Sequence, residues 1–373
     1  MFKTFFVSEL KYTLKQPMIY IFLGLISLLV FFAVTSDNVR IGNAVGNVYK
    51  NSPHIITTYI SIMTIFGLLI ATAFYNNAAL RDFNNNFNEI IFSTPLSKSG
   101  YFFGKFLGAL ILATVPLLGV YLGVIVGSFM APIFGWVDAE RFGNFYLETF
   151  VNNYLIFVLP NMFFVGAIIY AIANKWRSTV ISFAGTLIII VAYIISGTLM
   201  SDVDNESLAA LTDIFGNRTY SIQTQYFTPM EKNTISPTFS GLVLWNRIVW
   251  VLVGLAILLL SYFNFSFKEK NKKVKAEKKQ VQSETTIFAL PELHFQYDRK
   301  ANWLQFKSFF FVNFLSIIKS VTFKILFIFS AIILISNLFG GFEYFGLQSY
   351  PLTYKLIDLI NNASGIFVVI ILV

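Results

Sequence analysis

The chain has 373 residues, of which 56% are hydrophobic and only 12% charged, and it contains no cysteine. That composition leaves too little polar surface for a soluble protein, whereas the recurring apolar runs of about twenty residues match the length of a helix that crosses a bilayer. The runs are far longer than a barrel strand, and helices satisfy their own backbone groups in lipid. We therefore expect an all-α, polytopic helical membrane protein without disulfides or thiolate metal sites.

The chain begins twice, which predicts two copies of one membrane unit. Residues 2–6 read Phe-Lys-Thr-Phe-Phe and residues 306–310 read Phe-Lys-Ser-Phe-Phe. Each is followed by an apolar run, a polar stretch, a proline and a second apolar run, and the second copy stops inside an apolar run at Val373. We expect the chain to be a fragment cut within its second half, with about four more spans to follow.

Eight spans are predicted in chain order, and the basic residues between them set the orientation. The spans lie at about 18–34, 55–74, 106–130, 151–173, 180–200, 244–265, 321–338 and 354–373. Most of the 27 lysines and arginines fall in loops on one side, which the positive-inside rule makes cytoplasmic. The net charge of +8 therefore indicates topology and contact with membrane lipids, not nucleic-acid binding. The predicted parts are a first half of six spans over 1–267, a lysine-rich cytoplasmic linker over 268–301 and the start of a parallel second half over 302–373.

The N-terminal segment is amphipathic at helical spacing. Its apolar face carries Phe2, Phe5, Phe6 and Leu10, and its polar face includes Lys3, Ser8, Glu9 and Lys11. Such a helix lies in the cytoplasmic headgroup layer, either as a simple anchor or as an interface helix beside a partner. The pattern recurs at residues 303–318, and this favours the interface helix, because an anchor need not be repeated.

A helical hairpin is predicted between the second and third spans. Leu80, Phe83, Phe87, Ile90 and Ile91 recur at helical spacing, while Arg81, Asp82 and Glu89 lie on other faces. Pro95 should end this helix, and Ser97 or Ser99 should cap the next one. The segment is either an ordinary loop or a rigid lever that moves two spans together. The residues assigned to the lever are Arg81, Asp82, Phe83, Phe87, Glu89, Ile90, Ile91, Pro95, Leu96, Ser97 and Lys98.

The third span carries two ladders of glycines four residues apart, separated by Pro116. The ladders are Gly100, Gly104 and Gly108, then Gly119, Gly123 and Gly127. Small residues at this spacing let another helix backbone approach closely, and a proline permits a kink. We expect these glycines to pack helices together, which by itself says nothing about cargo.

The sequence shows no site for chemistry. His54 and His294 are far apart and neither belongs to an H-E-x-x-H pattern, and Gly100 to Lys105 lacks the spacing of a phosphate-binding loop. We therefore expect no catalytic residue, cofactor or metal, no ATP bound by this chain, and an energy source in another subunit. The polar loop at 201–241 is a solvated loop by default and a candidate contact for an extracytoplasmic partner.

The stretch Ser-Thr-Pro-Leu-Ser-Lys-Ser-Gly-Tyr-Phe-Phe-Gly-Lys at residues 93–105, together with Arg81 and Asp82, resembles the permease subunits of type-2 ABC exporters. The loop pattern of residues 213–216, 231–234 and 246–247 is similar to a subgroup of large bacterial permeases with two six-span halves, some fused to a zinc aminopeptidase domain. Ile214 departs from the proline common there. The resemblance implies a non-enzymatic transport subunit in the bacterial cytoplasmic (inner) membrane, with cytoplasmic ABC ATPase subunits binding the hairpin.

Two other classes remain open on the residues alone. One is an ion-coupled secondary transporter, although the predicted span interiors lack a paired set of acids and bases. The other is a membrane scaffold for an extracytoplasmic peptidase domain that lies beyond the fragment. A lipid, a peptide, an antibiotic or a polysaccharide would suit an exporter equally.

Overall fold

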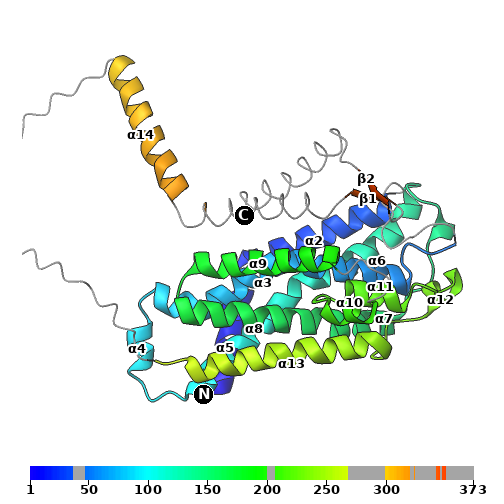
Figure 1. The fold of residues 1–373 in the computed structure, drawn as a ribbon, viewed down its shortest axis with the longest axis horizontal. Helices are drawn as coiled ribbons and strands as arrows, with labels where there is room; N and C mark the ends of the chain where they lie inside the picture. The colour runs from blue at the N-terminus through cyan, green and yellow to red at the C-terminus, as the bar shows by residue number, and fades with distance from the viewer. Residues whose placement is uncertain are drawn as a thin grey trace, which may run out of the picture. The chain divides into compact units, whose positions relative to one another are not determined.

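The computed structural model describes residues 1–36, 47–199, 206–267, 299–319, 323, 342–344 and 347–349. The chain divides into two compact units, Met1–Phe265 with Phe329–Val373, and Ser266–Ile328. In the first unit the long helices α3, α5, α8, α9 and α13 lie side by side as a bundle (Figure 1). We call the end with α1 and α4 the basic end, and the opposite end, with α7 and α10 to α12, the loop end.

The described elements of the first unit are nearly all helical. They are α1 (Phe2–Leu14), α2 (Pro17–Thr35), α3 (Pro53–Asn84), α4 (Asn88–Phe92), α5 (Lys98–Thr114), η2 (Val115–Leu117), α6 (Leu118–Ile133), η3 (Ala139–Arg141), α7 (Leu147–Asn153), the π-helix η4 (Tyr154–Val158), α8 (Leu159–Trp176), α9 (Thr179–Leu199), α10 (Glu206–Thr212), α11 (Asn217–Gln223), α12 (Pro229–Thr234) and α13 (Gly241–Asn264). The described structure is thus helical, as expected, with one short antiparallel ladder, β1 (Phe342–Tyr344) with β2 (Leu347–Ser349), as an exception.

Five stretches of described helix are long and apolar enough to cross a membrane, which makes the chain a multi-pass membrane protein. They are Pro17–Thr35, Pro53–Asn84, Lys98–Ile133, Leu147–Trp176 and Gly241–Asn264. The predicted fifth span coincides with α9, an apolar helix of 21 residues. The predicted spans at 321–338, apart from residue 323, and at 354–373 lie outside the described residues.

Helix α3 is longer than the predicted span because it continues past the bilayer at the basic end. It begins sharply, with Pro53 in its first turn and the side chain of Ser52 accepting from the Ile55 amide. At 1.5 Å per residue its 32 residues extend about 48 Å, against a hydrocarbon core of about 30 Å. The last turns of α3 therefore project from the membrane as part of the same rigid rod.

The two glycine ladders bind two different helices, as close packing predicts. A Cβ on Gly104 would lie 3.0 Å from the Phe2 carbonyl oxygen of α1, and one on Gly123 would lie 2.5 Å from the Ser27 carbonyl oxygen of α2. Pro116 sits in η2, a short 3₁₀ turn that joins α5 to α6 within one membrane crossing. The first ladder thus holds the N-terminal helix and the second holds the first span.

In the second unit the structure describes one helix, α14 (Arg299–Lys319), which covers the predicted repeat of the interface helix. Its aromatic side chains Trp303, Phe306 and Phe310 are exposed, and they stack along one face with ring centroids 5.6 and 6.4 Å apart. Of the predicted linker, 268–301, residues 268–298 lie outside the described residues.

Candidate functional site

A buried ionic network joins three helices at the basic end. Arg81 of α3 donates to both carboxylate oxygens of Glu9 in α1, at 3.1 and 2.8 Å. Its neighbour Asp82 accepts from Lys105 of α5 at 2.5 Å and from the Tyr101 hydroxyl at 2.8 Å. Two acids and two bases balance each other, and a buried pair is tolerated only with such geometry. The network ties α1, α3 and α5 together where α3 leaves the membrane.

The position of Glu9 differs from the sequence expectation. We predicted it on the water-facing side of α1, but it is 1% exposed and lies against α5. Gly108 makes the room, because a Cβ there would come within 2.8 Å of the Glu9 Cβ. The face of α1 that packs on α5 therefore combines Phe2, Phe5 and Phe6 with one acid, and Leu10 is only partly covered.

The predicted hairpin is present, but its first helix is shorter than predicted. α3 ends at Asn84 and not at Pro95, because Asn86 takes a left-handed conformation with φ 56° that an asparagine tolerates. The chain turns there into the short helix α4, and the Phe87 amide donates to the Asp82 carbonyl at 2.8 Å. Ser97 is the N-cap residue of α5, as predicted, although its side chain makes no capping hydrogen bond.

The hairpin presents apolar side chains at its tip. Phe87 is 56% exposed and Ile90 65% exposed, whereas Ile91 and Leu96 are half-buried. Behind the tip, the Phe92 ring contacts Phe83 at 5.7 Å. The tip is therefore an uncovered apolar surface on a short helix that protrudes from the bundle beside the N-terminus (Figure 1).

The end of α13 closes the base of the hairpin. The Lys98 ammonium donates to the Phe263 carbonyl at 3.3 Å and lies 4.7 Å from the Tyr262 ring centroid. Phe265, at the end of the first unit, stacks on Tyr101 with centroids 5.9 Å apart. Since Tyr101 also holds Asp82, the aromatic base and the ionic network form one packed joint.

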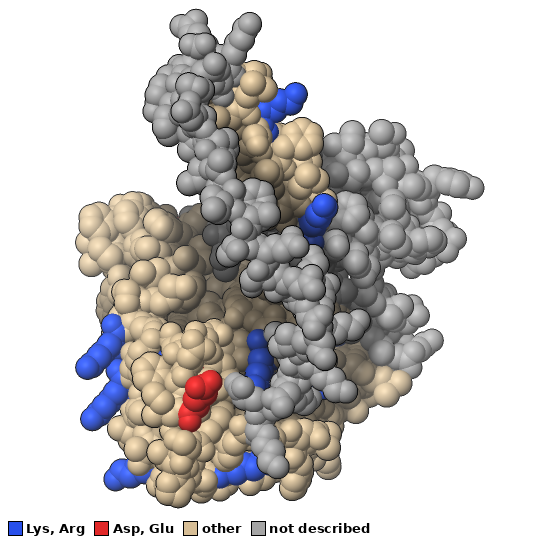
Figure 2. Space-filling model, turned by 90° about the vertical axis from the view of Figure 1, so that its left-hand side faces the viewer, with Lys and Arg blue, Asp and Glu red and all other residues tan. Residues whose placement is uncertain are grey.

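Basic side chains surround this joint on the surface. Figure 2 views this end of the molecule and shows scattered lysines and arginines with a single acidic patch. The exposed lysines are Lys3, Lys11, Lys15 and Lys175. Among the described residues of the basic end, Glu89 is the one exposed acid, because Glu9 and Asp82 are buried. A surface of this charge favours an acidic partner or anionic lipid headgroups.

At the loop end, two of the sequence patterns meet in a second buried cluster. The guanidinium of Arg247 donates to the Asn161 side-chain oxygen at 2.6 Å, to Asn246, and to the carbonyl of Ile214 at 3.3 Å. Asn246 in turn donates to the Asp213 carbonyl at 2.8 Å. The start of α13 is thereby fixed to α8 and to the turn before α11, so these residues have a packing role.

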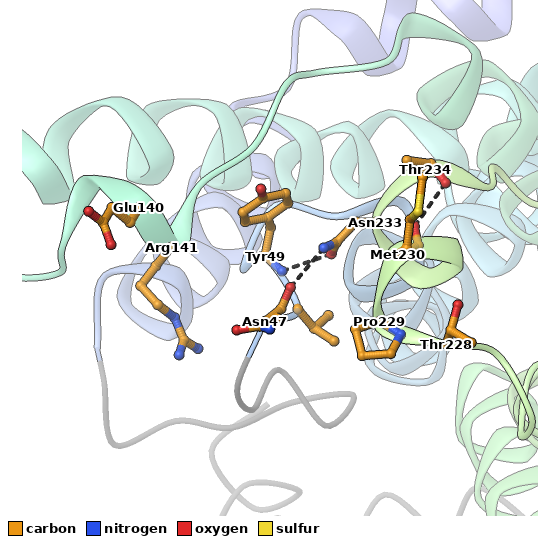
Figure 3. Close-up of a pocket in the computed structure, with 10 residues that line it drawn as sticks. Asn47, Tyr49, Glu140, Arg141, Thr228, Pro229, Met230, Asn233 and Thr234 are labelled. Carbon is orange, nitrogen blue, oxygen red and sulfur yellow. Dashed lines mark hydrogen bonds between the residues drawn. The ribbon is translucent and has the colours of Figure 1, made fainter.

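The third pattern, residues 231–234, builds a pocket of about 800 Å³ (Figure 3). Asn233 accepts from the Tyr49 amide at 2.9 Å and donates to the Asn47 carbonyl at 2.8 Å, so that α12 and the segment before α3 form two walls. Hydrogen bonds from the backbone and side chain of Thr228 lower the pKa of Glu231. The Thr228 side chain accepts in turn from the Glu231 amide, so the two residues form a capping box at the start of α12. Glu140 and Arg141 of η3 lie across the pocket from α12.

No family model, no curated protein and no solved structure matches this chain. Its function is therefore argued from the geometry and the sequence patterns. Sequence reasoning placed Arg81 and Asp82 near the hairpin but missed their partners Glu9, Tyr101 and Lys105. It also placed Lys98 there but missed its contacts with α13. Periodicity gave no signal for Glu9, because it places this residue on the polar face of the N-terminal helix.

Proposed function

We propose that the chain is the membrane-spanning permease subunit of an ATP-driven ABC exporter of the bacterial cytoplasmic membrane, with cytoplasmic ATPase subunits supplied in trans. The observation that supports this most is the basic end: an uncovered apolar tip, Phe87 and Ile90, is connected to three helices through a buried ionic network. The pattern at residues 93–105 supports the same assignment by resemblance.

The joint suits a transmission of force. A partner that grips α4 pulls on α3 and α5 together, because α4 is joined to both by short turns. Helix α3 carries the displacement along its whole length, and α1 follows because Arg81 holds Glu9. The four buried charges keep their partners only if the three helices move as one body, since separating a buried pair is costly.

The proposal is tested by placing a charge on the tip. We expect Ile90→Asp and Phe87→Asp to leave membrane insertion intact but abolish co-purification of the ATPase, because the partner would have to bury an unpaired carboxylate. Tyr226→Asp is the matched control: it adds the same charge to an exposed aromatic residue at the loop end. Normal ATPase binding by both tip variants would remove the coupling role from the hairpin.

The two rival functions predict different outcomes in the same preparation. An ion-coupled transporter would move its substrate with the proton gradient in the absence of any ATPase. A scaffold for an extracytoplasmic peptidase would carry peptidase activity in the full-length protein and bind no ATPase with or without the tip variants. A partner at the 201–241 loop remains a prediction, and the pocket beside α12 is where we would seek it.

A further inference from the structure

The buried face of α3 changes character along its length. Near the loop end it carries His54, Thr57, Ser61 and Thr64, which are spaced three and four residues apart and are all at least nine-tenths buried. Further along, the face carries Leu68 and then Thr72, whose buried hydroxyl is satisfied by the Leu68 carbonyl at 2.7 Å and lies 2.6 Å from the Thr186 hydroxyl. A polar stripe inside a membrane-spanning bundle needs hydrogen-bond partners, because lipid and apolar side chains supply none.

The opposite wall is built by α7, η4 and the start of α8, all of which pack on α3. It also carries buried polar side chains, Asn153 and Asn161. Between them the backbone is π-helical over Tyr154–Val158, so the regular helical ladder is already interrupted. Asn161 reaches across and donates to the Thr64 hydroxyl at 3.3 Å, which is where the two polar walls meet.

On the loop side of that contact, Thr57 donates to the Pro53 carbonyl at 2.7 Å, but other polar groups are not satisfied by the protein. Within the described part of the chain, Nδ1 of His54, Oγ of Ser61 and both amide atoms of Asn153 have no hydrogen-bond partner. Unpaired buried groups of this kind cost free energy that solvation would return. The interface between α3 and the opposite wall is therefore less stable on the loop side of the Thr64–Asn161 contact.

On the other side of the contact, the same pair of helices is tightly joined. The Tyr75 hydroxyl donates to the Met162 carbonyl at 2.9 Å, and the Tyr75 ring fills the space above Gly166 so completely that a Cβ there would overlap it. One interface thus has a satisfied, interlocked half toward the basic end and an unsatisfied half toward the loop end.

We infer that the seam between α3 and α7–η4 is a hydrated binding site. It opens at the loop end about a pivot at Thr64 and Asn161, and it binds water and other small uncharged molecules that form hydrogen bonds. Hydroxyls and side-chain amides line it, and these suit a neutral polar ligand better than an ion. The His54 ring lies against Tyr220 of α11, with ring centroids 5.4 Å apart. The seam would open in the same way whatever drives the protein, so it stands apart from the ATPase.

The cysteine-free chain permits a direct test with single cysteines in the purified full chain in nanodiscs. Ser61→Cys reports on the seam, and Leu68→Cys is the matched control, because it lies two turns further on the same face and is equally buried. The probe is a small, uncharged methanethiosulfonate that carries a hydroxyl group. We expect Ser61→Cys to react at least about tenfold faster, which corresponds to an opening easier by about 1.4 kcal/mol.

A second change tests whether the unpaired amide causes the opening. Asn153→Leu replaces it with an apolar group of similar size, so we expect slower labelling of Ser61→Cys and an unchanged or higher melting temperature. Equal rates at Ser61→Cys and Leu68→Cys, or no reaction at Ser61→Cys, would overturn the inference. An unchanged rate in the Asn153→Leu background would also overturn it, since η4 would then not be the second wall.

Discussion

The buried pair between Glu9 and Arg81 makes the sharpest stability prediction. Arg81→Met removes the guanidinium but leaves the Glu9 carboxylate 1% exposed with no hydrogen-bonded base, because Lys105 donates to Asp82. Loss of one partner from such a pair costs about 3–5 kcal/mol. Arg81 itself is 16% exposed, so we expect the lower end, about 3 kcal/mol, or roughly a hundredfold in the unfolding equilibrium constant.

The reverse change should cost less. Glu9→Gln leaves Arg81 partly solvated, over the Tyr12 ring at 4.1 Å and 4.0 Å from Asp82, so we expect about 1.5 kcal/mol. The double variant should be more stable than the sum of the two singles predicts, since neither charge is then left alone. Titration of the detergent-solubilised protein with SDS, followed by circular dichroism, measures all three. Strict additivity, or equal losses in the two single variants, would refute the pairing.

Two further predictions concern packing and orientation. Gly123→Ala should destabilise the bundle by about 1–3 kcal/mol, because its Cβ would lie 2.5 Å from the Ser27 carbonyl oxygen. The control is Gly24→Ala on α2, which has open space around it and should be neutral or stabilising. Equal melting temperatures for the two variants would contradict the close approach of α2 and α6. In intact cells, Thr238→Cys at the exposed loop end should react with an impermeant thiol reagent, and Ser97→Cys only after permeabilisation; the opposite pattern would reverse the topology.

Hydropathy located the spans well where the helix faces lipid. The predicted 18–34 and 244–265 are α2 (Pro17–Thr35) and α13 (Gly241–Asn264) within a few residues, because lipid contact demands apolar side chains over the full crossing. The same rule could not find the end of α3. Its last turns are polar, and they stay helical because Arg81 and Asp82 find partners on α1 and α5.

The network itself was beyond local pattern reasoning. Glu9 and Arg81 are separated by 72 residues, and amphipathicity assigns Glu9 to water unless one knows that a glycine of α5 lies opposite. Likewise, helical periodicity carries apolar residues from Leu80 to Ile91, but the single left-handed residue Asn86 ends α3 within that run. The π-helix at η4 leaves no signal in side-chain periodicity that a short window reveals.

The stacking of Phe265 on Tyr101 has a practical consequence for dividing the protein. The predicted sixth span, the last of the first half, ends at this residue. A first half trimmed back to the end of α13 would lose a ring that also contacts Phe102 at 5.5 Å. The foot of the hairpin would then be open on one side. Any version of the first half prepared alone should therefore retain Phe265. A protein or label fused shortly after Phe265 will lie at the base of the hairpin, not at a chain end that is free of contacts.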